Sequence, residues 1–242
     1  MTLLFLAGTG EAKALAKDLA NRNIPAIASL AGATRAPDTL DLPTRVGGFG
    51  GEAGFRAYLA EAGITRVVDA THPFARQITD RTARICADLG LPYLLLRRPP
   101  WTPVDGDRWT YIDREEQAAD HVQPGQTVFL GTGRQTLARF ANLKGAEVIC
   151  RQIDPPDTPF PFPGGRYLVG RPPFPVEQEK QLFQQLGVDW LIVKNAGGRL
   201  SESKLTAARA LQIPVLMINR PPPPDAEIVE TVAAALDWIG TA

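Results

Sequence analysis

The sequence contains few cysteines, no excess of charge and no long apolar run. Only two of its 242 residues are cysteines, Cys86 and Cys150, so we expect neither a disulfide framework nor a zinc site. The 26 basic and 26 acidic residues cancel, which leaves no overall field to attract nucleic acid or a membrane surface. The longest apolar runs are too short to span a bilayer.

Several catalytic signatures are also missing. The chain has no nucleophile elbow, no zinc-ligand spacing, no P-loop lysine and no patch of interleaved aromatic and basic residues. Its first six residues lack the basic region of a signal peptide, and their apolar run continues directly into a glycine turn. We therefore expect a cytoplasmic protein without a metal site, whose ligands are small molecules rather than nucleic acid or membranes.

A repeated pattern is present instead: an apolar strand, Gly-Thr-Gly, then a helix. It occurs at residues 4–15 and again at 128–137. Glycines at a strand-to-helix turn let the backbone approach a ligand, and the N–H groups that open the helix attract anions. Tight turns need glycine whatever they bind, but the matched pair favours one anion-binding turn in each half of the chain.

The rest of the chain alternates short β-type runs with helical stretches, which is typical of α/β folds with parallel sheets. We expect strands near 3–7, 25–30, 44–47, 65–69, 92–96, 127–130, 146–151, 189–193 and 214–218. We expect helices near 11–22, 52–62, 75–89, 134–142, 175–186, 202–211 and 225–239, and a stiff proline-rich loop at 155–165.

This order predicts two Rossmann-like lobes with a cleft between the carboxyl ends of their strands. We expect a nucleotide-binding domain at 1–98, a linker region at 99–124 and a second domain, on the substrate side, at 125–242. Matching polar turns follow the fourth strand of the first half, at 69–75, and the corresponding strand of the second half, at 194–198. Ligands of open α/β sheets bind at such strand ends.

The first glycine turn carries part of a dinucleotide fingerprint. Gly8-Thr9-Gly10 lacks the third glycine of G-x-G-x-x-G, whose place falls at Lys13 or Ala14. The motif alone is therefore weak evidence for a dinucleotide.

The end of the second strand distinguishes NAD from NADP in such folds, through an acidic or a basic residue respectively. Residues 29–35 contain Ser29, Thr34 and Arg35 but no acid. The planar fork of Arg35 can bond two phosphate oxygens at once, although a solvated loop charge would look the same in a sequence. We expect NADPH rather than NADH if this lobe binds a dinucleotide.

The second half leaves two assignments open. Asp154 follows the equivalent strand and could hold a ribose, so that this lobe would bind NAD. Arg134 directly follows the second Gly-Thr-Gly and suits a substrate carboxylate. We prefer the second assignment.

His72 and Lys194 are the titratable groups that we expect the two polar turns to direct into the cleft. An imidazole at a strand end can donate a proton or bond a cofactor amide, although a histidine in this place can also only cap the next helix. Lys194 begins the turn that contains Asn195, Gly197 and Gly198. Water is an alternative source of any proton.

Several motifs occur together in the order and spacing of a known family: 6–12, 69–75, 97–101, 131–134, 194–198 and 204–209, followed by 214 and 220–221. In these motifs the chain resembles the precorrin-6A reductases of cobalamin biosynthesis over almost its full length. Asp-Ala-Thr-His-Pro-Phe-Ala and Lys-Asn-x-Gly-Gly are specific, whereas the glycine turns are not. Ala196 is a mild departure, because serine is common there.

The resemblance implies NADPH-dependent reduction of a ring double bond in precorrin-6A to give precorrin-6B, with hydride added to one carbon and a proton to its neighbour. It implies a polycarboxylate tetrapyrrole substrate and its transient hand-over between pathway enzymes. The residues expected to bind NADPH are Gly8, Thr9, Gly10, Glu11, Ser29, Thr34, Arg35, Thr71, His72, Pro73 and Phe74. Those expected to bind the substrate are Gly131, Thr132, Gly133, Arg134, Arg151, Lys194, Asn195, Gly197, Gly198 and Lys204, and the expected catalytic groups are His72 and Lys194.

Two other function classes fit the residues alone: a nucleotide-sensing module without turnover and a nucleotide-sugar transferase, each with two Rossmann-like lobes. Arg35 favours the reductase over the transferase, because a sugar nucleotide has no 2′-phosphate. Only the resemblance separates the enzyme from the sensor, and it leaves open whether the substrate carries cobalt.

Overall fold

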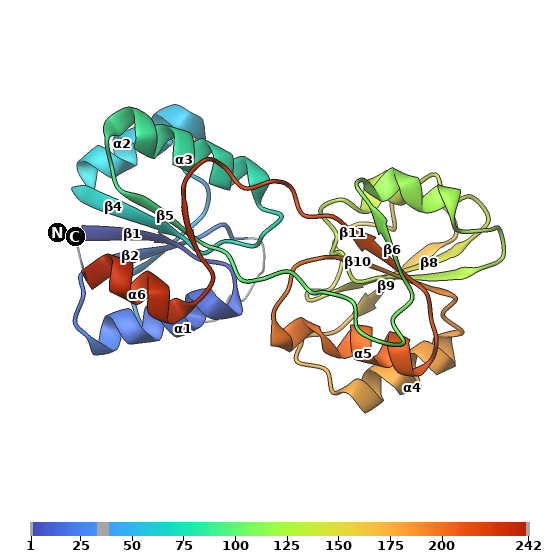
Figure 1. Ribbon diagram of the computed structural model, residues 1–242. Coiled ribbons are helices and arrows are strands. Elements are labelled where there is room, and N and C mark those ends of the chain that lie inside the picture. The colour runs from blue at the N-terminus through green and yellow to red at the C-terminus, as the bar shows by residue number, and fades with distance from the viewer. Residues whose placement is uncertain (1, 33–38, 241–242) are drawn as a thin grey trace. The chain divides into compact units, whose positions relative to one another are not determined.

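The computed structural model describes residues 2–32 and 39–240. They form two compact units (Figure 1). Unit 1 comprises residues 1–99 and 221–242, and unit 2 comprises residues 100–220. Each unit contains one six-stranded sheet in which every neighbouring pair of strands is parallel.

The sheet of unit 1 has the order β12-β5-β4-β1-β2-β3. Its strands are β1 (Thr2–Leu6), β2 (Ala26–Leu30), β3 (Thr44–Val46), β4 (Ile64–Asp69), β5 (Tyr93–Leu96) and β12 (Glu227–Val229). One face is covered by α2 (Gly51–Glu61) and α3 (Arg76–Leu89), and the other by α1 (Gly10–Asn21) and α6 (Val232–Gly240) (Figure 1).

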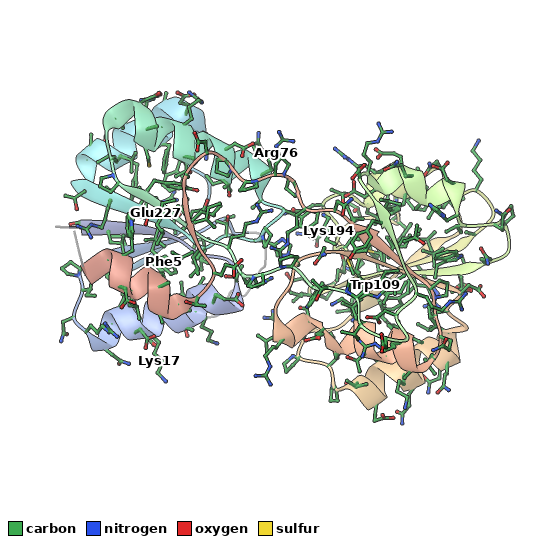
Figure 2. The ribbon with its side chains drawn as sticks, viewed as in Figure 1. Phe5, Lys17, Arg76, Trp109, Lys194 and Glu227 are labelled. Atoms are coloured by element: carbon green, nitrogen blue, oxygen red, sulfur yellow. The ribbon has the colours of Figure 1, made fainter. Side chains whose placement is uncertain are left out.

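The central strand β1 supplies side chains to both layers of unit 1. Leu3 and Phe5 belong to the core shared with α1 and α6, whereas Leu4 and Leu6 belong to the core shared with α2 and α3. Figure 2 shows Lys17 projecting outward from α1, on the opposite side of that helix from the sheet. A strand covered on both faces has an unbroken apolar sequence, which is why β1 is recognisable from residues alone.

The sheet of unit 2 has the order β6-β11-β10-β7-β8-β9. Its strands are β6 (Trp109–Ile112), β7 (Thr127–Leu130), β8 (Glu147–Gln152), β9 (Gly165–Val169), β10 (Trp190–Lys194) and β11 (Val215–Ile218). The helices α4 (Val176–Leu186) and α5 (Ser203–Ala210) lie on one face (Figure 1). Three short 3-10 helices complete the unit: η1 (Glu115–Asp120), η2 (Leu137–Phe140) and η3 (Arg199–Ser201).

Both sheets have the strand order of the doubly wound dinucleotide-binding fold. Counted from the strand before each glycine turn, the order is 3-2-1-4-5 in each unit, and a sixth strand extends the far edge. The sixth strand is not the next one along the chain: β12 returns from the C-terminal part to pair with β5, and β6 enters ahead of β7 to pair with β11. The predicted α/β class with two Rossmann-like lobes is confirmed.

The edge strands β6 and β12 explain where the compact units differ from the predicted domains. Residues 109–112 belong to the sheet of unit 2 rather than to a linker, and residues 221–242 belong to unit 1 rather than to the second domain. These strands have four and three residues, too few for their periodicity to be distinguished from that of a loop.

Two predicted helices are wrong in whole or in part. Residues 134–142 form only η2, where the buried side chains of Leu137, Phe140 and Leu143 recur every three residues, the period of a 3-10 helix. The helix predicted at 225–239 begins only at Val232, because β12 precedes it. The strand β9 was not predicted, since it directly follows the proline-rich loop. The other predicted strands and helices agree with the structure to within one residue at each end.

Candidate active site

The glycine turn and the 69–75 turn of unit 1 leave adjacent strands at the same edge of the sheet. Leu6, at the end of β1, is paired with Asp69, at the end of β4. The strand order reverses between these two strands, and ligands of doubly wound sheets bind outside the strand ends at this point. This edge is therefore the candidate cofactor site.

Thr9 joins the start of α1 to the end of β4. Its hydroxyl donates a hydrogen bond to Ala70 O at 2.9 Å and accepts one from Ala12 N at 3.1 Å, so the side chain caps the helix. The N–H groups of Gly10 and Glu11 have no acceptor among the described residues, as is usual in a first helical turn. They are two donors for an anion at this helix end.

Packing within unit 1 does not require a glycine at position 8. A Cβ atom added to Gly8 would lie 3.9 Å from His72 N and from Thr71 Cα, which is ordinary contact. A ligand that approaches the backbone closely would explain the glycine.

Glu11 places a carboxylate in the first turn of α1, where an anion would bind. It forms an ion pair with Arg98, in which Nη1 lies 2.5 Å from Oε2. The two side chains are 27% and 14% exposed, respectively. Arg98 therefore compensates the charge of Glu11 at this helix end.

Asp69 fixes the shape of the 69–75 turn. Its buried carboxylate accepts hydrogen bonds from Thr71 N at 2.9 Å and from the Tyr93 hydroxyl at 3.0 Å. Burial and the neighbouring Asp69 raise the pKa of Tyr93, so its hydroxyl stays protonated and donates. The Thr71 hydroxyl lies 3.2 Å from that of Thr79. Thr71, a predicted cofactor ligand, thus has a structural role.

His72 lines a pocket at the strand ends of unit 1. Its Nδ1 accepts a hydrogen bond from Phe74 N at 3.3 Å, so the neutral ring carries its proton on Nε2. The residues that line this pocket are Thr71, His72, Pro73, Arg76, Thr79, Asp80, Leu95, Arg97 and the four prolines at 221–224.

Arg97 holds the segment that begins with the four prolines at Pro221 and again at β12. Its Nη2 donates to Pro221 O at 2.7 Å, and its backbone N–H donates to Val229 O, in β12, at 2.8 Å. Burial lowers the pKa of Arg97. Arg76, the first residue of α3 (Figure 2), forms an ion pair with Asp80 at 3.0 Å. The pocket thus combines an imidazole, two guanidinium groups and a carboxylate.

An arginine in β3 that sequence reasoning missed lies beside the end of β2. Arg45, in β3, is in register with Ser29 and donates from Nη1 to its hydroxyl oxygen at 2.8 Å. The guanidinium lies 3.8 Å from the centroid of the Phe49 ring. The predicted 2′-phosphate ligands, Thr34 and Arg35, lie outside the described residues.

In unit 2, the first glycine of the second Gly-Thr-Gly makes room for a lysine. A Cβ atom added to Gly131 would lie 3.1 Å from Val193 Cγ1 and 3.4 Å from Cδ and Cε of Lys204. Real Cβ atoms seldom come this close, so alanine would displace one neighbour. Gly131 is therefore explained by its close packing against Val193 and Lys204, unlike Gly8 in unit 1.

The residues after Gly131 differ from those after Gly8. Thr132 is largely buried, and Gly133 has a φ of +73°, a conformation that favours glycine. Arg134 lies in a turn before η2, and no α-helix begins here in the described part of unit 2. The prediction of a second anion-binding helix N-terminus is wrong for this reason. A contact between Arg134 and a substrate carboxylate stays a prediction.

The 194–198 turn is built around Trp101. The buried side chain of Asn195 accepts a hydrogen bond from Trp101 N at 2.8 Å and donates one to Trp101 O at 3.0 Å. Gly197 and Gly198 have φ angles of +67° and +85°, and Gly198 O accepts from Trp101 Nε1 at 3.2 Å. Asn195, Gly197 and Gly198, all predicted to bind substrate, thus have structural roles.

Lys194 ends β10 and is largely buried (Figure 2). Its Nζ lies 3.9 Å from Oε1 of Glu115, which is also buried. Burial lowers the pKa of Lys194, the charge of Glu115 opposes this shift and that of Arg139 adds to it. Lysines with lowered pKa values are common in functional sites.

Arg151 is bonded to a carboxylate of the protein itself. Its two terminal nitrogens each lie 2.7 Å from an oxygen of Glu179, and the two side chains are 9% and 1% exposed. Its guanidinium also stacks 4.1 Å from the Phe174 ring centroid. Asp154, the alternative ribose ligand, has an oxygen 3.8 Å from Arg171 Nη2.

Within residues 2–32 and 39–240, no group of three or more histidine, cysteine, aspartate or glutamate side chains is arranged to hold a metal ion. No helix in this part of the chain is long and apolar enough to cross a membrane.

A family model described as "Precorrin-6x reductase CbiJ/CobK" matches residues 2–240. The chain belongs to this family. The resemblance inferred from the motifs is thereby confirmed. A solved structure of CobK precorrin-6A reductase matches with a TM-score of 0.94 at 40% sequence identity, over 99% of this chain and 96% of that one.

The similar proteins of this precorrin-6x reductase family carry two names, precorrin-6A reductase and cobalt-precorrin-6A reductase. This chain is 44% identical over 242 residues to precorrin-6A reductase of Rhodococcus erythropolis, covering 99% of this chain and 97% of that protein. It is 41% identical over 238 residues to precorrin-6A reductase of Rhodobacter capsulatus, covering 98% and 95%. It is 26% identical over 232 residues to cobalt-precorrin-6A reductase of Priestia megaterium, covering 90% of each chain.

Proposed function

We propose that this protein is a precorrin-6A reductase that uses NADPH to reduce one ring double bond of its substrate. The observation that carries the proposal is the match of nearly the whole chain to the precorrin-6x reductase family, whose members include precorrin-6A reductases 41–44% identical to it. The Rossmann strand order of both units agrees with a dinucleotide-dependent reaction.

The difference between the two glycine turns supports binding of NADPH by unit 1. Gly8 leaves room for a close ligand and is followed by α1, with two N–H donors and the Thr9 cap. Gly131 is instead packed against Lys204 and is followed by a short 3-10 helix. The residues of unit 1 therefore fit a pyrophosphate better than those of unit 2.

The end of β2 supports NADPH over NADH. Ser29 in β2 is bonded to Arg45, which brings a positive charge to this strand end. The next residues supply Thr34 and Arg35 and no acid to hold a ribose diol. Arginine is suited to a 2′-phosphate because it can donate two parallel hydrogen bonds.

NADPH supplies the hydride, and the protein binds and orients both reactants. We assign to the Nε2–H group of neutral His72 a hydrogen bond to the carboxamide at the reactive end of the cofactor, and the position of His72 beside the first glycine turn supports this assignment. In unit 2, the ammonium of Lys194 and that of Lys204 supply positive charge for a substrate with several carboxylates. A side-chain acid would speed protonation of the second carbon by a factor of about 10²–10⁴ at most, and water can serve in its place.

The pattern of relatives supports a metal-free substrate. The relatives named precorrin-6A reductase are 37–44% identical to this chain, and those named cobalt-precorrin-6A reductase are 25–29% identical. We expect precorrin-6A to be reduced faster than its cobalt form.

The test is anaerobic incubation of the purified protein with precorrin-6A and NADPH, followed by the absorbance of the macrocycle and of the nicotinamide together. We expect one NADPH to be oxidised for each precorrin-6A reduced. The reaction should be slower when NADH replaces NADPH or when cobalt-precorrin-6A replaces precorrin-6A. NADPH that is bound but never oxidised in the presence of precorrin-6A would support the nucleotide-sensing alternative and overturn the proposal.

A further inference from the structure

Unit 2 contains a cavity of about 120 Å³ that is separate from the 194–198 turn and is lined by several polar side chains. It is lined by residues at the carboxyl ends of β7, β8 and β9 and at the start of α5. Its polar lining consists of Arg151, Gln152, Glu179, Ser201, Ser203 and Lys204. We call it the Gln152 pocket, after the last residue of β8.

Gln152 is buried without hydrogen-bond partners. It is 8% exposed, and neither Oε1 nor Nε2 has a partner among the described residues. Leaving a buried donor or acceptor unpaired costs about 1–3 kcal/mol, and native proteins seldom do so without a functional reason. The side chain therefore offers one donor and one acceptor to a ligand in the pocket.

Lys204 brings a fixed positive charge to the same pocket. Its side chain is 8% exposed, its stem packs against Gly131, and its Nζ donates to Ser201 O at 2.5 Å. The ammonium also lies 5.5 Å from the centroid of the Trp101 ring. These contacts hold the charge at one wall and leave little freedom for it to move away.

The charges of the lining favour a ligand with one negative charge. The ionisable side chains of the lining are two cations, Arg151 and Lys204, and one anion, Glu179, which is paired with Arg151, so their charges sum to +1. A cavity of about 120 Å³ has room for a small polar group. Together with the positive charge of the lining, this suits a short anionic arm of a larger ligand.

We propose that the Gln152 pocket binds one alkyl carboxylate arm of the substrate. Lys204 supplies the charge, Gln152 Nε2 donates to a carboxylate oxygen, and Gln152 Oε1 accepts from a water that enters with the arm. The inference rests on the proposed function, because precorrin-6A carries acetate and propionate side chains. It makes Gln152, which the motifs did not indicate, a residue that determines substrate affinity.

The first test uses sodium propionate as the probe and the side-chain NH₂ signals of Gln152 in a ¹⁵N–¹H NMR spectrum. The signals are assigned by their loss in Gln152→Leu, or in Gln152→Asn if the leucine variant does not fold. We expect them to shift with propionate, and to shift much less with propionamide or with sodium chloride at the same ionic strength. Signals that do not respond to propionate, or that respond equally to propionamide, would overturn the carboxylate assignment.

The second test compares Gln152→Leu with Gln181→Leu, the same change at an exposed position of α4. Gln152→Leu removes both unpaired atoms, so we expect its unfolding midpoint to be unchanged or higher. We expect its KM for precorrin-6A to rise about tenfold, with the KM for NADPH unchanged. A lower midpoint with an unchanged KM would show that Gln152 is only structural.

The two tests separate this inference from the proposed function. If the Gln152 signals of the wild type shift with propionate but the protein does not reduce precorrin-6A, the proposed function is contradicted and the carboxylate pocket is supported. Protein that reduces precorrin-6A but does not respond to propionate contradicts the pocket alone.

Discussion

Asn195 and Trp101, 94 residues apart in the chain, exchange two hydrogen bonds between the asparagine side chain and the tryptophan backbone. The backbone oxygen of Asn195 also accepts a hydrogen bond from Arg220 Nε at 2.5 Å. Trp101 lies at the start of unit 2 and Arg220 at its end. The Lys-Asn-x-Gly-Gly motif thus ties both ends of unit 2 to the end of β10.

We predict that Asn195→Ala lowers the free energy of unfolding by about 2–4 kcal/mol, because it leaves the buried N–H and C=O groups of Trp101 without partners. Urea unfolding of the variant and the wild type measures the difference. Asn142→Ala is the control, since that exposed side chain makes one hydrogen bond to Glu116 O. Equal stabilities for Asn195→Ala and Asn142→Ala would contradict this role.

The motif could be recognised from the sequence, but its partner could not. Polar residues after a buried strand indicate a ligand site, and Asn195 fits that rule by position. Its amide is nonetheless bonded to a backbone segment that only the folded chain brings near. The same limit applies to Glu11 and Arg98, which are 87 residues apart. The periodicity of a sequence predicts which face of a helix or strand is buried, but it does not predict which polar side chains contact one another in the folded chain.

The second prediction concerns that ion pair. Arg98→Ala leaves the Glu11 carboxylate uncompensated in the first turn of α1, where it would repel a pyrophosphate. We expect the Kd for NADPH to rise about tenfold, measured by calorimetric titration. The double variant Arg98→Ala with Glu11→Gln should recover most of the affinity. A double variant as weak as Arg98→Ala would show that Arg98 itself, and not the charge of Glu11, governs binding.

The third prediction concerns cofactor choice. The wild type should bind NADPH more tightly than NADH, and Arg35→Ala should reduce that preference about tenfold, the equivalent of one charge-assisted hydrogen bond. Arg22→Ala, just beyond the C-terminus of α1, is the control and should leave the preference unchanged. Equal affinity of the wild type for both cofactors would remove the basis for assigning a 2′-phosphate to Arg35.

The fourth prediction separates the two expected catalytic groups. His72→Ala should lower kcat by a factor of no more than about 10⁴. Turnover should not be abolished, because water can supply the proton. Lys194→Ala should raise the KM for precorrin-6A more than it changes the affinity for NADPH. Steady-state kinetics with each reactant varied in turn measures both. Wild-type kinetics in both variants would exclude these two turns from the active site.

The lowered pKa of Lys194 gives this prediction a pH dependence. An ordinary lysine loses its charge near pH 10.5, and burial moves this loss to lower pH for Lys194. The KM for precorrin-6A should therefore begin to rise below that pH. In Lys194→Arg the charge persists, so its KM should stay flat over the same range. Parallel profiles for the two proteins would show that Lys194 does not bind the substrate through its charge.

The predicted strand ends were reliable because an unbroken buried apolar run such as that of β1 identifies a central parallel strand. The predictions failed where tertiary packing decides. Arg134 was expected to begin a helix, but the apolar spacing after it suits a 3-10 turn. Gln152 looks like any strand residue in the sequence, and its unpaired amide is visible only in the folded unit.

The most direct test of the reductase assignment is the transfer of label from the cofactor to the macrocycle. Precorrin-6A is incubated anaerobically with the protein and NADPH that carries deuterium at both C4 positions of the nicotinamide, and the product is analysed by mass spectrometry. We predict a product that contains one deuterium from the cofactor and one proton from solvent. A product without deuterium, or no product while NADPH remains bound, would contradict the account.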